Sequence, residues 1–390
     1  MSEWKKVKLG EIASAIQTGP FGSQLHQSDY SDEGTPVVMP KDIVCGKIDV
    51  SSIARVENHH VERLSRHKIN EGDILYARRG DVGKCAYTDK SQTGWLCGTG
   101  CLRVTIDNAK AMPEFVFFQL QKKDTIGWVE KHAIGATMLN LNTSILSDVP
   151  IELPSLSTQQ RIAVILSRYD SLIENYQKQI KLLEEAAQRL YKEWFVDLRF
   201  PGYENTKIID GVPEGWEKKC VDSVYSIKYG KNLSTKLITA DGNYPVYGAN
   251  GVIGYYDKAN CNEQVVLITS RGNGSGDVLM TYHKDAFITN NSFIVIPLNE
   301  YDYCQLPFTY QFLKNANFRS VRTGAAQPQL TNQSIHTVDV ILPQKELIIE
   351  YCKRIQRSND VGVHLRNQIR LLTEARDRLL PKLMSGEITV

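Results

Sequence analysis

The residues best suited to hold a ligand are two arginines that recur in one setting. Arg79 and Arg271 each precede a glycine, and each follows a run of apolar residues that predicts a β-strand. An arginine in the turn after a strand can donate parallel hydrogen bonds to a phosphate or to the acceptor edge of a guanine base. A surface salt bridge is the alternative. The chain therefore carries two matched candidates for contact with an anionic ligand.

Patterns that would support catalysis are missing from the sequence. The glycine-rich stretch 271–277 lacks the Gly-Lys-Ser/Thr ending of a phosphate loop, and the residues after it predict a strand instead of a helix. We therefore expect a glycine-rich hairpin there. Neither a Gly-x-Ser-x-Gly elbow nor an Asn-Pro-Pro-aromatic motif occurs. We predict no catalytic residues.

The cysteines and histidines are not grouped as metal ligands. Of eight cysteines only Cys97 and Cys101 lie close together, and no second pair follows at the spacing of a zinc site. We expect reduced and mostly buried thiols. No His-Glu-x-x-His pattern surrounds His59, His60 or His67. The prediction is a chain without a metal site and without a cofactor of its own.

One loop occurs twice in the chain. GATMLNLNTSI begins at Gly135 and GAAQPQLTNQSI begins at Gly324, 189 residues later. The same offset persists through the segments that follow, which indicates an internal duplication. Farther upstream the copies drift to larger offsets, as at Trp4 and Trp216. Each copy therefore has a variable globular part followed by a constant tail.

Short amide and hydroxyl side chains fill both copies of the loop. Such groups can hydrogen-bond a phosphate or an adenine, or they can brace the junction between a globular part and its tail. We favour the bracing role and retain ligand binding as the alternative. The residues are Thr137, Asn140, Asn142, Gln327 and Gln329.

The constant tails predict two long helices. A strand at 149–153 and the breaker Pro154 precede the first helix, and Ser157 with Gln160 offers a capping box. Apolar residues then recur at spacings of three and four, as in a coiled-coil seam. The expected seam comprises Leu166, Tyr169, Ile173, Tyr176, Ile180, Leu183 and Leu190 in the first helix, and Leu365, Ile369, Leu372 and Leu379 in the second.

The second seam is the weaker one. Ser358, Gly362 and Arg376 stand at positions where apolar residues belong, so we expect looser packing in its first half. Proline and glycine close both tails. The expected stops are Pro201 with Gly202 and Pro381 with Gly386.

The length of these helices decides how they pack. About 35 residues make a rod of about 50 Å, which is too long to lie on one globular part. The alternative, each helix lying on its own globular part, is therefore less favoured. We predict an α+β fold in which two similar mixed α/β domains are joined by two long helices, packed as an antiparallel coiled coil with pseudo-twofold symmetry.

Composition and charge distribution limit the class of molecule that this chain can have as a partner. The 390-residue chain is 42% hydrophobic and carries a formal net charge of +2, as expected for two globular units. No apolar run is long enough for a membrane span and the start lacks the apolar core of a signal peptide, so we expect a cytoplasmic protein. The windows 131–147, 223–240 and 303–338 contain basic but no acidic residues, which favours a polyanionic partner.

An extended polyanion with two-fold symmetry is DNA. Two units held about 50 Å apart would contact it more than one helical turn of about 34 Å apart. This predicts two sequence-specific contacts with unread base pairs between them. Specificity is expected in the divergent regions 17–87 and 228–291. Besides the loop amides, the candidate contacts are Arg78, Arg79, Lys84, Lys228, Lys231, Asn232, Arg271, Asn273, Arg319 and Arg322.

The ordered duplication resembles a known family, the specificity subunits of type I restriction-modification enzymes. The likeness rests on the openings at Trp4 and Trp216, on GDILYARRG, on the two GA…L boxes, and on LLEEAAQRLYKEWF and LLTEARDRLLPKLMSGEI. It covers essentially the whole chain in the family's order. The resemblance implies that each target-recognition domain reads one half of an asymmetric bipartite DNA site, while the helices act as spacer and dock two modification subunits.

The resemblance also implies partners and cofactors. Modification subunits would methylate adenine, and restriction subunits would supply translocation and cleavage, so S-adenosylmethionine, ATP and Mg²⁺ are expected in those partners and catalysis is not expected here. A coiled-coil scaffold that binds no DNA and a stand-alone DNA-modifying enzyme are the alternatives. The expected parts are a first recognition domain at 1–156, a central helix at 157–200, a second recognition domain at 201–344, and a distal helix with tail at 345–390.

Overall fold

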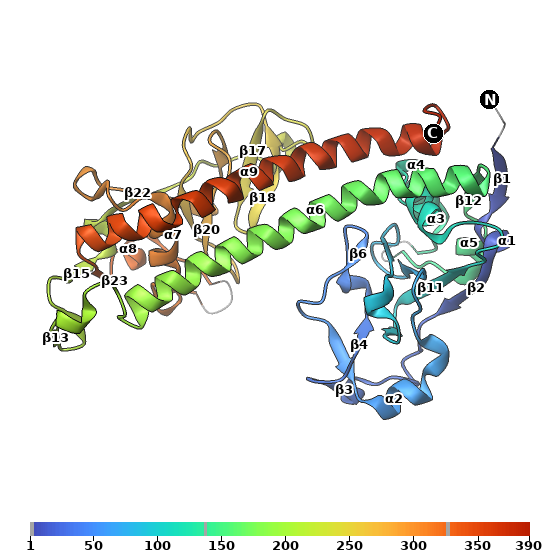
Figure 1. The fold of residues 1–390 in the computed structure, drawn as a ribbon, viewed down its shortest axis with the longest axis horizontal. Helices are drawn as coiled ribbons and strands as arrows, with labels where there is room; N and C mark the ends of the chain where they lie inside the picture. The colour runs from blue at the N-terminus through green and yellow to red at the C-terminus, as the bar shows by residue number, and fades with distance from the viewer. Residues whose placement is uncertain (1–3, 136–138, 325–327) are drawn as a thin grey trace. The chain divides into compact units, whose positions relative to one another are not determined.

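The chain forms two compact units. The computed structural model describes residues 4–135, 139–324 and 328–390 (Figure 1). Unit 1 comprises Met1–Ile173 with Leu371–Val390, and unit 2 comprises Glu174–Arg370. Each unit has its own hydrophobic core, as the length of the chain predicts. Within the described residues, no helix combines the length and apolarity that crossing a bilayer requires.

Unit 1 is built on an antiparallel sheet of order β2-β11-β8-β9. A second sheet has the order β10-β4-β7-β3, in which β10 and β4 are parallel. The strands are β1 (Lys5–Lys8), β2 (Ala13–Thr18), β3 (Tyr30–Ser31), β4 (Thr35–Val38), β5 (Ile43–Val44), β6 (Lys47–Ile48), β7 (Ala54–Val56), β8 (Ile74–Ala77), β9 (Cys85–Tyr87), β10 (Leu96–Cys97), β11 (Cys101–Ile106) and β12 (Pro150–Leu153). The helices of its globular part are α1 (Leu9–Ile12), α2 (Asn58–Arg63), α3 (Pro113–Leu120), α4 (Lys123–His132) and α5 (Thr143–Ser147).

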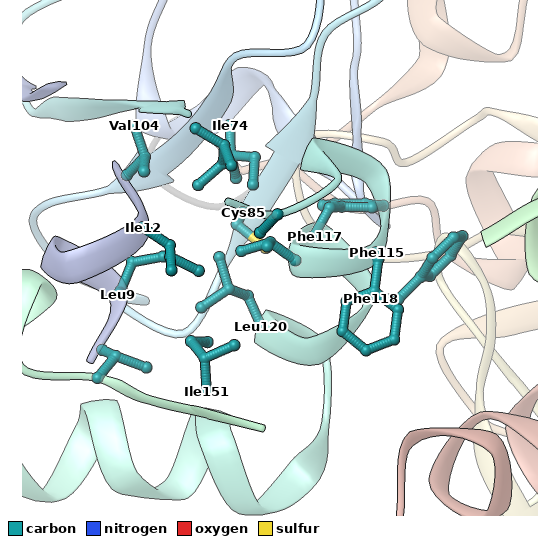
Figure 2. Close-up of a cluster of buried hydrophobic side chains, with 14 of the residues drawn as sticks. Leu9, Ile12, Ile74, Cys85, Val104, Phe115, Phe117, Phe118, Leu120 and Ile151 are labelled. Atoms are coloured by element: carbon teal, nitrogen blue, oxygen red, sulfur yellow. The ribbon is translucent and has the colours of Figure 1, made fainter. Parts of the chain in front are cut away.

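The core of unit 1 gathers around α3 and the central sheet (Figure 2). Pro113 opens α3 in the first turn, where a backbone N–H would have no acceptor within the helix. Phe115 and Phe118 of this helix share a buried cluster with Ile74 and Val104 of the sheet. Burial of one such side chain stabilises the fold by about 1.5–3 kcal/mol. The apolar run of α3 therefore fixes the helix onto the strands that carry the Arg79 turn.

Unit 2 repeats this topology. Its central sheet has the order β16-β22-β19-β20, which corresponds strand for strand to β2-β11-β8-β9. The parallel pair of β17 and β21 corresponds to β4 and β10, and β15 with β23 corresponds to β1 with β12. The strands are β13 (Ile208–Ile209), β14 (Val212–Pro213), β15 (Glu217–Cys220), β16 (Tyr225–Tyr229), β17 (Tyr244–Gly248), β18 (Gly251–Tyr256), β19 (Val266–Thr269), β20 (Val278–Met280), β21 (Phe287–Ile288), β22 (Ser292–Pro297) and β23 (Asp339–Leu342). Its short helices are α7 (Leu306–Lys314) and α8 (Asn332–Ile335). The duplication in the sequence is thus a duplication of the fold.

Two long helices run through both units. They are α6 (Leu156–Tyr191, 36 residues) and α9 (Lys345–Met384, 40 residues), green and red in Figure 1. In unit 1, Arg376 of α9 pairs with Asp170 of α6, with Nη1 2.7 Å from Oδ1. In unit 2, Tyr351 Oη donates to Ala187 O at 3.1 Å. As the contact residue in α6 advances from 170 to 187, its partner in α9 falls from 376 to 351. The predicted antiparallel pairing is therefore confirmed.

Each core contains the start of one helix and the end of the other. Ile162 and Leu166, near the start of α6, are buried in unit 1 together with Leu383 at the end of α9. In unit 2 the roles are exchanged, with Ile348 from the start of α9 and Tyr191 from the end of α6. The alternative of a helix lying only on its own globular part is therefore wrong, because each helix ends in the core of the other unit.

The two opening tryptophans share one role. In unit 1, Trp4 packs against the tail that follows α9, where Gly386 is so close that an added Cβ would lie 3.1 Å from the indole nitrogen. In unit 2, Trp216 packs against the segment that follows α6, with ring centroids 6.0 Å from Phe195 and 5.4 Å from Phe200. Each tryptophan thus covers the end of a helix that began in the other unit.

Three details of the helix ends differ from the sequence predictions. The predicted cap Ser157 is wrong, since α6 begins one residue earlier and Ser155 Oγ accepts from Thr158 N at 3.3 Å. The chain leaves α6 through a π-helical turn after Tyr191, well before Pro201. Pro381 does not stop α9, because its fixed φ is compatible with a helix and only the bond from its own nitrogen is lost; the helix ends at Met384, just before Gly386 with φ of +74°.

The seam between the helices follows the predicted residues. Leu166 and Leu365 are buried, and the other nine predicted seam residues are half-buried. Ser358 and Gly362 line a cavity in unit 2 of about 50 Å³ together with Ile180 and Leu183. The predicted loose packing in the first half of the second seam is therefore present.

Arg376, the third residue that interrupts the second seam, forms an ion pair with Asp170, and this pair predicts a measurable coupling energy. Asp170 and Arg376 are only 24% and 28% exposed, so removing Arg376 leaves the Asp170 carboxylate poorly solvated, whereas removing Asp170 leaves Arg376 paired with Asp377. A double-mutant cycle of Asp170→Ala and Arg376→Ala is expected to give a coupling of about 1 kcal/mol in the free energy of unfolding, measured with urea.

The exposed pair Lys181 and Glu185 on α6 is the control for that cycle. Its side chains are 78% and 38% exposed, so its coupling is expected near zero. Equal couplings in the two cycles would contradict a stabilising role for the Asp170–Arg376 pair.

Candidate nucleic-acid interface

A tight turn carries each of the two matched arginines. Residues 78–84 connect β8 to β9 in unit 1, and residues 270–277 connect β19 to β20 in unit 2. Gly80 and Gly272 have φ of +77° and +82°, angles that other residues rarely adopt, so each turn needs its glycine. The glycine-rich stretch of unit 2 is the predicted hairpin, and both arginines follow a strand as predicted.

In unit 1 the repeated loop is clamped to this turn through the backbone. Leu141 N donates to Arg78 O at 2.8 Å, and Gly80 N donates to Leu139 O at 3.2 Å. A buried backbone group without a partner costs about 1–3 kcal/mol, so turn and loop stabilise each other.

Unit 2 repeats these bonds at the equivalent positions. Leu330 N donates to Ser270 O at 2.7 Å, and Gly272 N donates to Pro328 O at 2.9 Å. The loop residues lie 189 positions and the turn residues 192 positions after their counterparts, which are the offsets of the duplication. The loop occurs twice because each Arg-Gly turn is held by its own copy.

One residue of each loop faces the arginine across this contact. Asn140 forms isolated β-bridges with Arg79 and, within the loop, with Ile134. Gln329 forms the same two kinds of bridge in unit 2, one of them with Arg271. The side chain of Gln329 is exposed, whereas Asn140 is half-buried and its Oδ1 has no hydrogen-bond partner.

Asn142 braces the fold. Its Oδ1 accepts from Ile145 N at 2.8 Å and caps α5. In unit 2, Thr331 Oγ1 accepts from Ser334 N at 3.1 Å and caps α8 in the same way. The bracing interpretation thus describes Asn142, whose side-chain oxygen is already engaged. Thr137 and Gln327, also predicted from this loop, lie outside the described residues.

Neither of the two matched arginines has a side-chain partner among the residues that the structure describes. Arg79 and Arg271 are both exposed, and neither side chain forms a hydrogen bond or ion pair with any described residue. The alternative of a surface salt bridge therefore does not account for either. Their guanidinium groups remain available to a ligand.

Two other predicted contacts are engaged in ion pairs. Lys84 Nζ lies 3.0 Å from Asp81 Oδ2, and Arg319 Nη2 lies 2.6 Å from Asp277 Oδ1. Both pairs are largely exposed and so contribute at most about 1 kcal/mol. Each pair lies on or beside an Arg-Gly turn and neutralises its single carboxylate.

A half-buried arginine accompanies each exposed one. Arg78 Nε, and both Nε and Nη2 of Arg322, are buried without a hydrogen-bond partner. The Arg78 guanidinium lies 5.9 Å from the centroid of the Phe21 ring. Phe21 is 51% exposed, and the sequence prediction missed it. An aromatic residue inside the polar stretch that follows β2 was the available signal.

The remaining predicted residues surround the same region of unit 2. Lys228, Lys231 and Asn232 are exposed at the end of β16 and just after it, and Asn273 is exposed in the turn. Tyr229 connects β16 to the loop, since its Oη donates to Leu330 O at 3.3 Å. The end of β16 therefore lies against the clamped loop.

A polar cluster beside the helices was not predicted. In unit 2 the guanidinium of Arg366 lies 3.8 Å from the Tyr282 ring centroid and pairs with Glu184 of α6. Burial raises the pKa of Tyr282 to about 12. Because Gly362 has no side chain, the neighbouring Arg366 can reach both groups from α9. The weak part of the second seam thus holds polar contacts to the globular part.

The buried thiols are poorly suited to chemistry. Six of the eight cysteines are buried, as predicted, and all eight are free. Burial raises the pKa of the Cys85 and Cys97 thiols to about 12, so both are protonated at neutral pH. Across the residues that the structure describes, no group of His, Cys, Asp or Glu side chains could hold a metal ion.

The sequence as a whole identifies the family of this duplicated architecture. The family profile described as the type I restriction modification DNA specificity domain matches residues 1–185 and 213–370. The chain belongs to this family. The two matched stretches contain the two copies of the Arg-Gly turn.

Related proteins match along their whole length. The specificity subunit of the type I restriction enzyme MjaIX from Methanocaldococcus jannaschii is 26% identical over 418 residues, which cover 99% of this chain and 93% of that protein. The HindI specificity subunit from Haemophilus influenzae is 22% identical over 478 residues and is matched along its full length.

A solved structure has the same fold. The crystal structure of the type I restriction-modification S subunit from M. genitalium matches with a TM-score of 0.58 and 19% sequence identity, and it covers 97% of this chain and 96% of that one. The predicted α+β class and the antiparallel helix pair are confirmed.

The cap formed by Asn142 predicts a graded effect of substitution. Asn142→Ala is expected to lower the free energy of unfolding by about 1 kcal/mol, because Ile145 N loses its acceptor. Asn142→Ser keeps an acceptor and is expected to retain most of the stability. Thr331→Ala is the matched substitution in unit 2 and should cost a similar amount. Weakened DNA binding by the stable Ser variant would instead assign the Asn142 amide to the ligand.

Proposed function

We propose that this chain acts as the DNA sequence-specificity subunit of a type I restriction-modification complex, in which each unit reads one half of a bipartite, asymmetric DNA target. The observation that carries the proposal is the Arg-Gly turn with its clamped loop, present in both units of a member of this family while the surrounding loops differ. A chain with two unlike reading units suits a target with two unlike halves.

The helices α6 and α9 serve as spacer and as docking surface for modification subunits. Support for docking comes from apolar side chains that point away from the cores. Unit 1 exposes Leu172 and Leu371, and unit 2 exposes Leu182 and Val361, one from each helix in each unit. Exposed leucines and valines on long helices favour contact with a partner's apolar surface.

Catalysis belongs to the partners in this proposal. S-adenosylmethionine would be bound by the modification subunits, and ATP and Mg²⁺ by the restriction subunits. The protonated, buried thiols and the capped or paired polar residues of this chain are consistent with a binding role. The complex would act on DNA in the cytoplasm.

Neither alternative function is favoured. A scaffold without affinity for DNA would have no use for two equivalent, unpaired arginines on rigid turns. A stand-alone DNA-modifying enzyme would need a catalytic constellation, and membership in a family of specificity domains gives no support for one.

Mapping methylated adenines tests the proposal. The chain is co-expressed with the type I modification subunit of the same genome, and methylated positions are read by sequencing. The expected product is one two-part asymmetric motif with unread bases between its parts. A continuous motif, or methylation without any motif, would contradict the assignment.

Exchange of one domain provides the internal control. Replacing residues 1–150 by those of a relative with a different target is expected to change one part of the motif and to leave the other part unchanged. A change in both parts would show that the two units do not read DNA independently.

A further inference from the structure

We propose that the Arg-Gly turn of each unit is a phosphate anchor, in which Arg79 and Arg271 bind the DNA backbone in the same way in both units and without regard to base sequence. Arg78 and Arg322 supply a second cation beside each anchor. This inference rests on the proposed DNA-binding function. It divides the protein–DNA contacts into two classes: backbone contacts that are the same in both units, and base contacts made by loops that differ between the units.

The first argument is one of equivalence. The two units differ in loops, insertions and most side chains, yet in both the same backbone bonds hold a left-handed glycine turn, whose arginine has no partner among residues 4–135, 139–324 and 328–390. The halves of an asymmetric target differ in their bases and share only their sugar-phosphate backbone. A contact that is the same in both units therefore fits the part of the ligand that is the same in both halves.

The second argument is charge. In unit 1, residues 78–84 include three basic side chains, Arg78, Arg79 and Lys84, and one carboxylate, Asp81. In unit 2, the turn 270–277 and the segment 319–322 include three basic side chains, Arg271, Arg319 and Arg322, and one carboxylate, Asp277. Counted within these segments alone, the basic side chains outnumber the carboxylates by two in each unit, while in unit 1 the Glu130 carboxylate adjoins the turn at Gly83. Since Lys84 and Arg319 already pair with the carboxylates, the surplus resides on the remaining arginines.

The third argument is unmet hydrogen bonding. Arg78 and Arg322 have buried N–H groups without an acceptor, and Arg322 adjoins Thr323, which pairs with the same Gln329 that faces Arg271. A charged donor is rarely buried without a partner, because it loses its hydration. Phosphate oxygens would supply the missing acceptors with the geometry that guanidinium groups favour.

The fourth argument is rigidity. Hydrogen bonds fix the backbone of each turn to a loop that is itself closed by a β-bridge. The backbone position of the arginine is therefore defined before a ligand binds. A preorganised donor loses little conformational freedom on binding. Such an anchor would set how each sheet lies on the duplex, which the variable loops need before they can read bases.

Salt-dependent binding of the full-length chain tests the anchor. Arg79→Ala and Arg271→Ala are titrated with a duplex of scrambled sequence and with the mapped target duplex. Each substitution is expected to weaken binding to both duplexes by the same factor, about tenfold, and to reduce the slope of log affinity against log salt by about 0.9. The double variant should lose about twice that slope.

Two variants serve as controls. Arg79→Lys keeps the charge and is expected to retain the slope. Arg357→Ala removes an exposed arginine of α9 that belongs to neither turn, and is expected to change neither affinity nor slope. Thermal melting confirms that each variant is folded.

The outcomes separate the inference from the function on which it rests. If the wild-type chain shows no salt-dependent binding to duplex DNA, the proposed function fails and the anchor with it. If wild-type binding is salt-dependent but both alanine variants keep its slope and affinity, the anchor alone is overturned. A change in the recognised sequence would make the arginines base readers, and loss of modification-subunit binding with intact DNA binding would assign the turns to that partner.

Discussion

The structure depends on burying both ends of two long helices. A helix of this length presents more apolar surface than one small domain can cover, so α6 begins in the core of unit 1 and ends in that of unit 2, while α9 does the reverse. Each buried side chain at these ends stabilises the fold by about 1.5–3 kcal/mol. Neither core is complete without both helices, which explains why Trp4 and Trp216 each cover the end of a helix that started elsewhere.

Duplication of the fold separates what must stay constant from what can vary. The clamp between turn and loop uses backbone groups, so it tolerates different side chains, such as Leu139 in one copy and Pro328 in the other. The positive φ of Gly80 and Gly272 is the exception, because there the backbone itself requires glycine. Loops outside the clamp carry no such requirement, and there the two units differ in length and in elements.

Several features were predicted from neighbouring residues alone. The strands before each Arg-Gly turn, the glycine-rich hairpin and the two helices all follow from patterns within a few residues. The errors have a common cause: each residue was judged from its neighbours in the sequence, whereas packing decides where a helix begins and ends. Ser157 looked like a cap because of its spacing to Gln160, but Ser155 lies where the chain actually enters the helix. Pro381 looked like a stop, but burial of Leu383 and Met384 beyond it favours continuing α9.

By itself the sequence determined the duplication, the phase of the helical seams and the positions of the matched arginines, because periodicity and offset are properties of the chain. Tertiary structure decided which polar groups remain available. Arg319 is engaged by Asp277, 42 residues away, while Arg271, in the turn that ends at Asp277, has no partner in the described part of the chain. It also decided that Asn142 caps a helix. Ion pairs and caps depend on where folding brings distant residues together, and no local pattern records that distance.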